Sequence, residues 1–395
     1  MSCASIPLGN VVKVTAGQAA PPADAFGQAG TPFIRAGSVE GLMTRANWSD
    51  LEHLSEASAR KRGMKLFPAD TILFAKSGMS ATLGRVFRTD RPAYIVSHLA
   101  ALQPVGKADP AFLKHWLIHF GTQHLIKDPA YPSIRLADIE EMPFPNMPMP
   151  EQRRIAAILD QADALRGLRR QSLSRLSDLG QAIFFEMFGD VAANSRGWDE
   201  GYVLNDVAYV SSGITKGRKA NGKVMREVPY LAVSNVQDGQ VRLDVVKTIE
   251  ATDAEIQRYA LEPNDIVLTE GGDPDKLGRG GIWRGEIAEC IHQNHVFRVR
   301  LTDPNMRPLF LSRLIGSERG KRYFLRSAKQ TTGIASINMT QLKNFPLLSP
   351  PKEIQLEFEA NMGRLNKEMK RAKLAYEVSE HLFASLQHRA FRGEL

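Results

Sequence analysis

The chain has 395 residues, of which 43% are hydrophobic and 24% are charged, a composition typical of folded proteins with two or three domains and not of disordered or fibrous ones. It starts without a basic segment followed by an apolar one and contains no apolar run of about 18 residues, so we expect a cytoplasmic protein and neither export nor membrane insertion. Lys and Arg number 51 against 43 Asp and Glu, and the formal charge of +8 favours a polyanionic partner only weakly, because the excess is spread along the chain.

Residues 1–149 carry mixed strand and helix signals. The run "TILF" is short, β-rich and bounded by Pro, Asp and Gly, which is typical of a buried strand. Residues 110–120 indicate a helix that begins at a proline. We expect an α+β domain with a twisted sheet and long surface loops.

Residues 150–189 predict one long helix. Ile155, Leu159, Ala162 and Leu165 begin a narrow apolar stripe at steps of three and four, which continues through further residues. The rest of the stripe comprises Ile158, Leu168, Leu176, Leu179 and Ile183. Prolines 143, 145, 148 and 150 end whatever precedes the helix, and Gly189 is suited to its C-terminal end.

Residues 190–349 repeat the first 149 in order. "IPLGNVVKVTAG" (6–17) has its counterpart in "YVLNDVAYVSSG" (202–213), and "LFPADTILFAKSG" (66–78) has one in "LEPNDIVLTEGG" (261–272). Leu-Gly-Arg follows in both, then Ser97-His98 in the first copy and Asn294-His295 in the second. A repeat of about 200 residues therefore predicts two α+β domains of one kind, the second with a strand at "IVLT" and a helix from Pro308 to Phe324.

Residues 350–395 predict a second long helix with the same stripe, from Ile354 through Phe358 and Leu365 to Leu386. A helix of some 35 residues is roughly 50 Å long at about 1.5 Å per residue, and its stripe needs a partner. We expect the two helices to pair as an antiparallel coiled coil. The alternatives are that each helix packs on its own domain or that the helices form a homodimer seam.

This layout of domain, helix, domain and helix resembles the specificity subunits of type I restriction-modification systems over essentially the whole chain. The pieces that carry the resemblance are "FPADTILFAKSG", "LEPNDIVLTEGG", the proline-rich exits "EEMPFPNMPMPEQRRIAAILD" and "KNFPLLSPPKEIQLEFE", and the tail "LFASLQHRAFRGEL". One departure lies before the exits, where "KQTTGIAS" (329–336) contains glycine and its first-copy equivalent "IKDPAYPS" (126–133) does not.

The resemblance implies a noncatalytic chain with two target-recognition domains (1–149 and 190–349) and two conserved helical segments (150–189 and 350–395). Each domain is expected to read half of a split sequence in double-stranded DNA, and the helices to set the spacer and dock two modification subunits. Those partners would bind S-adenosylmethionine and methylate adenine, while a separate restriction and motor subunit would translocate and cut. We expect no cofactor or metal in this chain itself.

Base reading requires hydrogen-bonding side chains on loops near strand ends. On that criterion the candidates in the first domain are Lys76, Ser77, Arg85, Ser97 and His98. Those in the second are Lys216, Arg218, Lys219, Arg279, Gln293, Asn294, His295, Lys329, Gln330 and Thr331. Any single one of them has the alternative reading of a solvated surface charge or a structural turn.

Motifs for catalysis are missing. Ser349-Pro350-Pro351-Lys352 lacks the aromatic residue that a methyltransferase loop needs, and "TEGGDPDKLGRGG" fits no nucleotide-binding pattern. Cys3 and Cys290 lie far apart without a CxxC neighbour, which argues against a zinc cluster or a disulfide framework. The competing hypothesis from another class is an interaction scaffold, in which paired helices join two protein-binding domains that do not bind DNA.

Overall fold

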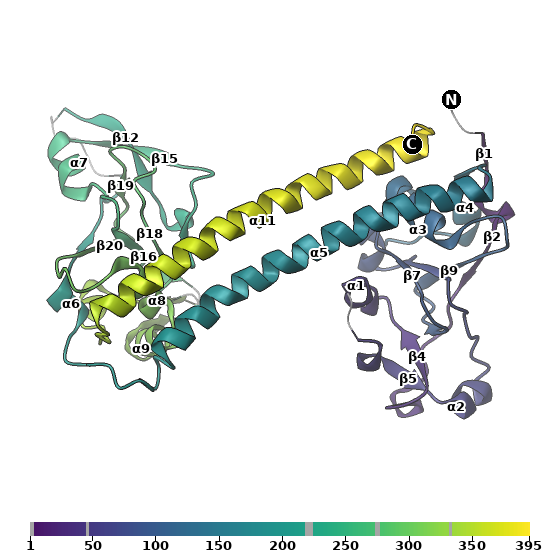
Figure 1. The fold of residues 1–395 in the computed structure, drawn as a ribbon, viewed down its shortest axis with the longest axis horizontal. Coiled ribbons are helices and arrows are strands. Elements are labelled where there is room, and N and C mark those ends of the chain that lie inside the picture. Colours follow the sequence, from purple (N-terminus) through teal and green to yellow (C-terminus); the bar gives the residue numbers. More distant parts are fainter. Residues whose placement is uncertain (1–3, 45–46, 218–223, 273–276, 332–333) are drawn as a thin grey trace. The chain divides into compact units, whose positions relative to one another are not determined.

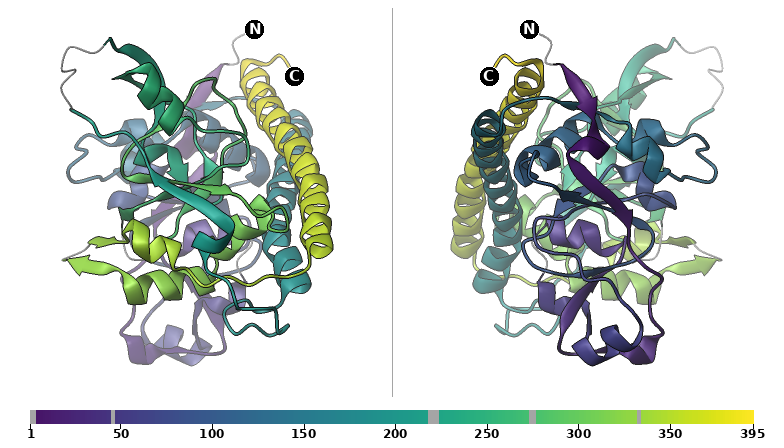
Figure 2. Two further views of the ribbon diagram at one scale, coloured as in Figure 1. Left: turned by 90° about the vertical axis from the view of Figure 1, so that its left-hand side faces the viewer. Right: turned by 90° about the vertical axis from the view of Figure 1, so that its right-hand side faces the viewer.

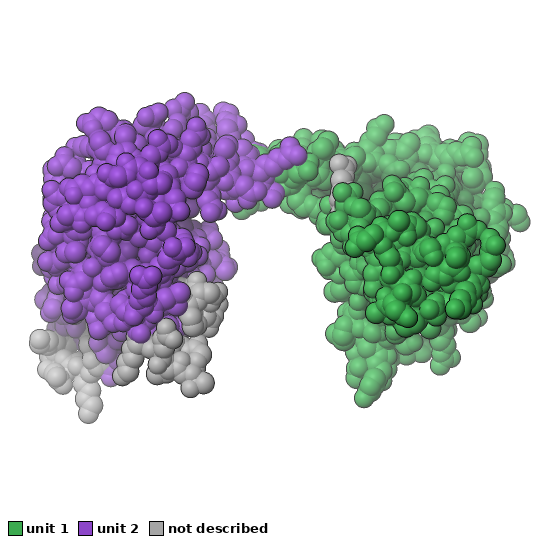
Figure 3. Space-filling view, turned by 90° about the horizontal axis from the view of Figure 1, so that it is seen from below, with its two compact units in different colours: residues 1–172, 372–395 green, residues 173–371 purple. Residues whose placement is uncertain are grey.

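The computed structural model describes residues 4–44, 47–217, 224–272, 277–331 and 334–395. The chain divides into two compact units (Figure 3). Unit 1 consists of residues 1–172 and 372–395, and unit 2 of residues 173–371. Each unit therefore contains one globular part together with a segment of each of the two long helices.

The central sheet of unit 1 has four antiparallel strands in the order β2, β9, β6, β7. These are β2 (Val12–Ala16), β9 (Leu99–Pro104), β6 (Ile72–Ala75) and β7 (Val86–Arg88). All four residues of β6 are buried because helix α3 (Pro110–Phe120) packs on one side and a second cluster of apolar residues on the other. Asp109 fixes the start of α3 by accepting the backbone N–H groups of Ala111 and Phe112.

A smaller sheet completes the globular part of unit 1, in the order β3, β5, β4, β8. Its strands are β3 (Phe26–Gly27), β5 (Glu52–Leu54), β4 (Thr31–Ile34) and β8 (Tyr94–Ile95), of which β4 and β8 run parallel. The remaining elements are α1 (Ser38–Met43), α2 (Glu56–Lys61), α4 (Leu136–Glu140) and the pair β1 (Ser5–Pro7) and β10 (Pro143–Pro145).

Unit 2 repeats this plan (Figure 1). Its central sheet has the order β11, β20, β16, β18, and its second sheet the order β15, β12, β19, again with one parallel pair. The strands are β11 (Ala208–Ser212), β20 (Val296–Leu301), β16 (Ile266–Thr269), β18 (Gly280–Ile282), β15 (Lys247–Ala251), β12 (Arg226–Leu231) and β19 (Ile291–His292). The predicted internal repeat and α+β class are confirmed.

The other elements of unit 2 include both repeated and additional ones. Helices α6 (Leu204–Val207), α7 (Asp253–Tyr259), α8 (Pro308–Gly316) and α10 (Met339–Lys343) accompany the hairpin β13 (Val236–Gln237) and β14 (Gln240–Val241). Helix α9 (Glu318–Ser327) leads into β21 (Lys329–Thr331) and β22 (Ile334–Ser336), which pair with each other, and β22 also pairs with β17 (Gly271–Gly272).

One glycine is required at the same place in each unit. A Cβ on Gly17 would lie 2.2 Å from the carbonyl oxygen of Ile95, and a Cβ on Gly213 would lie 1.9 Å from that of His292. Both glycines let a strand end pass directly over the neighbouring backbone. The repeated "AG" and "SG" of the sequence therefore mark a close approach that no larger residue permits.

Helices α5 (Met149–Phe188) and α11 (Lys352–Arg392) lie side by side within each unit (Figures 1 and 2). In unit 1, Arg166 lies over the ring of Phe383 and Arg169 donates to the carbonyl of Ala375. In unit 2, Phe184 packs against Phe358, whereas Gly180 faces Met362 and Leu365. Residue numbers rise along one helix as they fall along the other, so the predicted antiparallel pairing is confirmed.

The predicted stripe is buried only in part. Ile155, Leu159 and Ala162 pack into the core of unit 1, whereas Leu165, Leu168 and Leu179 are exposed. In the same way, Phe358, Met362 and Leu365 of α11 belong to the core of unit 2, but Leu382 is exposed. The pairing of α5 and α11 therefore buries the stripe only in part, and the first turns of each helix bury their apolar face against a globular core as well as against the other helix.

A buried glutamine fastens the first turn of each long helix. The Gln152 side chain accepts the N–H of Asp109 at 2.9 Å and donates to the carbonyls of Met147 and Lys107. Gln355 accepts the N–H of Arg307 at 2.8 Å and donates to the carbonyls of Pro350 and Asn305. Each amide thus ties the start of a long helix to the residue before α3 or α8. Among the described residues, no helix is long and apolar enough to cross a membrane.

Candidate nucleic-acid interface

In each unit, several of the predicted residues lie at one end of the central sheet. In unit 1 this is the end where β2 and β6 finish and β7 and β9 begin, and in unit 2 the end where β11 and β16 finish and β18 and β20 begin. Lys76 follows β6; its N–H donates to the carbonyl of His98, and its carbonyl accepts the N–H of Ile134. Glu270 follows β16 and makes the same two bonds with His295 and Ile337. These shared backbone hydrogen bonds show that Lys76 and Glu270 occupy equivalent positions in the two units, as do His98 and His295, whatever their side chains.

In unit 1 the sheet end presents a hydroxyl and an imidazole. The Oγ of Ser77 lies 2.8 Å from Nδ1 of His98, and His98 is exposed. The N–H of Ser97 donates to the carbonyl of Gln18 at 2.7 Å, which fixes the turn that carries His98. Within the described residues the Lys76 ammonium forms no ion pair, so its charge is available to a ligand.

In unit 2 the same place presents a carboxylate, an imidazole and an amide. Nδ1 of His295 lies 2.5 Å from Oε2 of Glu270, and Nδ2 of Asn294 lies 3.3 Å from Nε2 of His295. Ser212 fixes this turn by donating from Oγ to the carbonyl of Asn294 at 2.8 Å. The side chains of Glu270, Asn294 and His295 thus form a connected group at the surface, which we call the strand-end cluster of unit 2.

Neighbouring His292 and Gln293 serve the fold. The imidazole of His292 is fully buried, and burial lowers its pKa to about 4, so the ring is neutral at pH 7 and its Nδ1 donates to the carbonyl of Val296 at 2.7 Å. The N–H of Gln293 donates to the carbonyl of Leu231. The carbonyl of Gln293 accepts the N–H of Val296 at 2.9 Å, so Gln293 holds the backbone of this turn, while Asn294 and His295 of the predicted run of three join the strand-end cluster.

Two arginines stand at the same sheet end but are held by neighbours. Arg85 follows Gly84 and pairs with Glu40 at 2.7 Å. Arg279 follows Gly278, donates from Nη1 to Oε1 of Gln237 at 3.4 Å, and has a buried Nε without a partner among the described residues. A ligand that recruits either guanidinium must therefore compete with an existing contact.

The structure describes only some of the other candidates in unit 2. The Lys216 ammonium lies 5.0 Å from the centre of the Tyr230 ring, a cation–π contact. Arg218 and Lys219 lie outside the described residues. The backbone of Lys329, Gln330 and Thr331 forms β21, whose partner β22 pairs with Gly271 next to Glu270.

The two units differ at this hairpin. In unit 1 the segment before the exit forms a single bridge, between Ser77 and Ser133, in place of paired strands. Pro129 and Pro132 lack the N–H groups that a ladder requires, which accounts for the difference. The departure noted between "IKDPAYPS" and "KQTTGIAS" is therefore a real difference between the two units.

Glu270 was missed by the sequence analysis, because a carboxylate is not an obvious ligand for a polyanion. The signal was present in the alignment of "AKSG" with "TEGG", where Glu270 takes the place of Lys76. The two sheet ends therefore carry opposite charges at this position.

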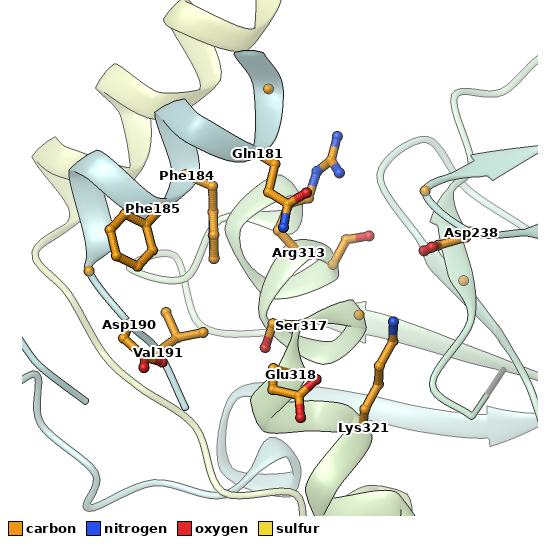
Figure 4. Close-up of a pocket in the computed structure, with 16 residues that line it drawn as sticks. Gln181, Phe184, Phe185, Asp190, Val191, Asp238, Arg313, Ser317, Glu318 and Lys321 are labelled. Carbon is orange, nitrogen blue, oxygen red and sulfur yellow. The ribbon is translucent and has the colours of Figure 1, made fainter. Parts of the chain in front are cut away.

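Hollows also lie elsewhere in the units. One in unit 1 has a volume of about 540 Å³ and is lined by Arg85, Arg88, Lys114 and Arg166 together with acidic partners including Asp163. One in unit 2, of about 310 Å³, lies beside the end of α5 (Figure 4). There Arg313 and Lys321 share the lining with Asp190, Asp238 and Glu318. Neither hollow has the single sign of charge expected of a phosphate groove.

A buried histidine near the first hollow belongs to the fold of unit 1. Nε2 of His115 lies 2.7 Å from Oδ1 of Asp160, and this hydrogen bond is the main cause that lowers the pKa of the Asp160 carboxyl. The contact ties α3 to α5. In the described part of the chain, no group of three or more His, Cys, Asp or Glu side chains could hold a metal ion.

Comparison with known proteins gives consistent results. Residues 4–177 match the family model described as the type I restriction modification DNA specificity domain. The chain is 24% identical over 388 residues to the type I restriction enzyme StySPI specificity subunit of Salmonella potsdam, covering 92% of this chain and 82% of that protein. It is 22% identical over 391 residues to the EcoKI specificity subunit of Escherichia coli K12, with the same coverage of both proteins.

Solved structures share the fold. The type I restriction-modification S subunit from M. genitalium aligns with a TM-score of 0.56 at 14% identity, over 98% of this chain and 95% of that one. A chain from a structural study of complex assembly and conformational transition in the type I R-M system aligns with a TM-score of 0.57, also at 14% identity, over 99% and 98%. The similarity extends over both globular parts and both helices.

Proposed function

We propose that this chain, which belongs to the specificity subunits of type I restriction-modification systems, reads a bipartite sequence in duplex DNA, one half-site with each unit. As a specificity subunit it is the noncatalytic, DNA-recognising component of its system. In the proposed arrangement the strand-end residues of unit 1 contact one half-site and those of unit 2 contact the other.

One observation carries this proposal: the two units present polar clusters at equivalent strand ends, held by the same backbone hydrogen bonds but built from different side chains. A fixed backbone with variable donors and acceptors is what base reading in the major groove requires. It also accounts for two half-sites of different sequence, since Ser77 and His98 in unit 1 face a different set of bases from Asn294 and His295 in unit 2.

We further propose that the helices dock modification subunits, as the family assignment suggests. In unit 1, Leu374, Val378 and Leu382 of α11 follow one another at steps of four and are 64%, 54% and 46% exposed. In unit 2, Leu179 and Phe185 of α5 are exposed as well. Exposed aliphatic and aromatic side chains along a helix suit the apolar face of a partner helix.

The partners would supply the chemistry. The modification subunits would bind S-adenosylmethionine and methylate adenine, and restriction and motor subunits would join the same assembly, which we place in the cytoplasm. The continuity of α5 and α11 through both units supports a role in setting the spacer between half-sites.

The test is to reconstitute the chain with its modification subunit and map methylated adenines by sequencing. Asn294→Ala should relax recognition in the second half-site alone, by roughly 1–3 kcal/mol for a lost base contact, and His98→Ala should do so in the first alone. Binding should also weaken steeply with salt, because phosphate contacts release counterions. An assembly that binds no duplex DNA at any salt concentration would favour the interaction scaffold instead.

A further inference from the structure

We propose that the carboxylate of Glu270 is a base-reading acceptor of unit 2, and that Lys76 is its counterpart of opposite polarity in unit 1. Glu270 would accept a hydrogen bond from the exocyclic amino group of a cytosine or adenine in the second half-site. Lys76 would donate to a guanine in the first. This inference rests on the proposed function and specifies the chemistry at one position of each half-site.

The first step of the argument is positional. Glu270 and Lys76 occupy the same place, since each donates its N–H to the carbonyl of the equivalent histidine and accepts the N–H of the equivalent isoleucine, Ile337 or Ile134. The flanking strands also correspond, β6 pairing with β7 and β9 as β16 pairs with β18 and β20. The main chain at this position is held in the same way in both units, but the side chains carry opposite charges. This position can therefore distinguish the two half-sites.

The second step concerns the charge itself. A carboxylate beside DNA phosphates is repelled by them, so it weakens binding to DNA in general. It favours binding only where a base presents a donor, and the amino groups of cytosine and adenine are the donors of the major groove. An ammonium finds its acceptors at guanine O6 and N7. The reversal from Lys76 to Glu270 therefore predicts a reversal from acceptor-bearing to donor-bearing bases.

The third step concerns orientation. His295 holds one oxygen of Glu270 through the 2.5 Å contact at Nδ1, and the His295 turn is itself fixed by Ser212. The Glu270 side chain remains about one-third exposed. A charged group that is anchored through one oxygen and partly accessible has lost much of its conformational freedom before a base arrives, which favours specific recognition.

The experiment maps methylated sites for the wild-type chain with its modification subunit, and then for Glu270→Ala, Glu270→Lys and Lys76→Ala. We expect Glu270→Ala to lose discrimination, roughly tenfold or more, at one position of the second half-site that is cytosine or adenine in the wild type. Glu270→Lys should shift that position towards guanine. Lys76→Ala should relax one guanine of the first half-site, with the second half-site unchanged.

Glu227→Ala, which removes an exposed carboxylate on β12 of the same unit, is the matched control and should leave both half-sites unchanged. If Glu270 only supports the fold, its variants will lower total methylation without altering the sequence preference, and that result overturns the inference. A wild-type assembly that methylates no bipartite site overturns the proposed function as well. Circular dichroism of each variant identifies those that fail to fold, and Lys76→Ala tests the idea in the other unit.

Discussion

Gln152 and Gln355 each satisfy three backbone groups from a single buried side chain, and water cannot replace them because both amides are almost completely covered. An amide supplies an acceptor and two donors together, which no hydroxyl or carboxylate of similar size does. The glutamine therefore joins three main-chain segments at the point where a long helix leaves its globular core.

Replacing Gln355 by Ala should lower the free energy of unfolding of unit 2 by roughly 2–3 kcal/mol, because the N–H of Arg307 and two carbonyls lose their partners. Gln152→Ala should do the same in unit 1. Denaturant titration measures both, and Gln171→Ala, at an exposed position of α5, is the control. Equal stability of the control and the two variants would rule out the anchoring role.

The neutral state of His292 makes the stability of unit 2 depend on pH. The pKa of His292 is lowered from 6.5 to about 4, first by burial, so the unfolded chain takes up a proton between these values and the folded chain does not. This contribution to stability is present in full above pH 6.5 and is lost as the pH falls towards 4, by up to roughly 3 kcal/mol.

His292→Asn should flatten the pH dependence of unfolding of unit 2 between pH 6.5 and 4, whatever its stability at pH 7. His381→Asn, which changes an exposed histidine of α11, should leave the profile unaltered. Denaturant midpoints at several pH values give the comparison, and a His292 variant that loses stability with acid as steeply as the wild type would contradict the assignment.

At the scale of elements, the space around the glycines of α5 and α11 shows where the two helices are closely packed. A Cβ on Gly180 would lie 3.3 Å from Cε of Met362 and 3.4 Å from Cδ2 of Leu365, whereas a Cβ on Gly167 or Gly363 would meet nothing within 4 Å. Gly180 therefore permits close contact of α5 with α11 in unit 2. Gly167 and Gly363 have no such role in the described structure.

Gly167→Ala and Gly363→Ala should each raise the free energy of unfolding by about 0.5–1 kcal/mol, through helix propensity alone. Gly180→Leu should lower it by roughly 1–3 kcal/mol, because the added side chain must displace Met362 and Leu365. Thermal or denaturant unfolding measures all three. A neutral Gly180→Leu variant would mean that the helices separate there without cost.

The elements themselves could largely be predicted from sequence. The strands at "TILF" and "IVLT" and the helix from Pro110 are local patterns bounded by strong turn residues, and all three were confirmed. The predicted helix from Pro308 to Phe324 is instead broken at Ser317 into α8 and α9. Periodicity records which face of a helix is apolar, but only tertiary contacts decide where that face is covered, which is why the exposure of Leu165 and Leu168 was not foreseen.

The site was predicted less completely. Asn294, His295, Ser77 and His98 could be chosen because polar residues at repeated strand ends are visible in the alignment. Their mutual contacts depend on side-chain direction, which sequence spacing does not determine. Glu270 became a candidate only once the shared hydrogen bonds of the sheet ends were known.

At the scale of the whole molecule, α5 and α11 span 40 and 41 residues without a break and contribute to both units. Inserting four residues after Ser172 and four after Arg371 would lengthen each helix by about 6 Å at about 1.5 Å per residue. If the helices set the spacer, the preferred gap between half-sites should grow by one or two base pairs, at about 3.4 Å each.

Methylation mapping of the double insertion gives the gap directly, and both half-site sequences should stay the same. An insertion in α5 alone is the control, since it disturbs the register with α11 and should reduce methylation without defining a new gap. An unchanged gap in the double insertion would refute the role of the helices in spacing.

The division of the chain into units also sets the order in which they can fold during translation. Unit 2 is one continuous stretch and can close as soon as residue 371 has left the ribosome, but the core of unit 1 includes Phe383 and Ala390 from the segment 372–395. The globular part of unit 1, which is translated before unit 2, must therefore wait, with Phe112 and its neighbours incompletely covered, until residues 372–395 have been translated. During that interval the nascent chain displays an apolar surface suited to a chaperone, and a truncation before Phe383 would make the exposure permanent.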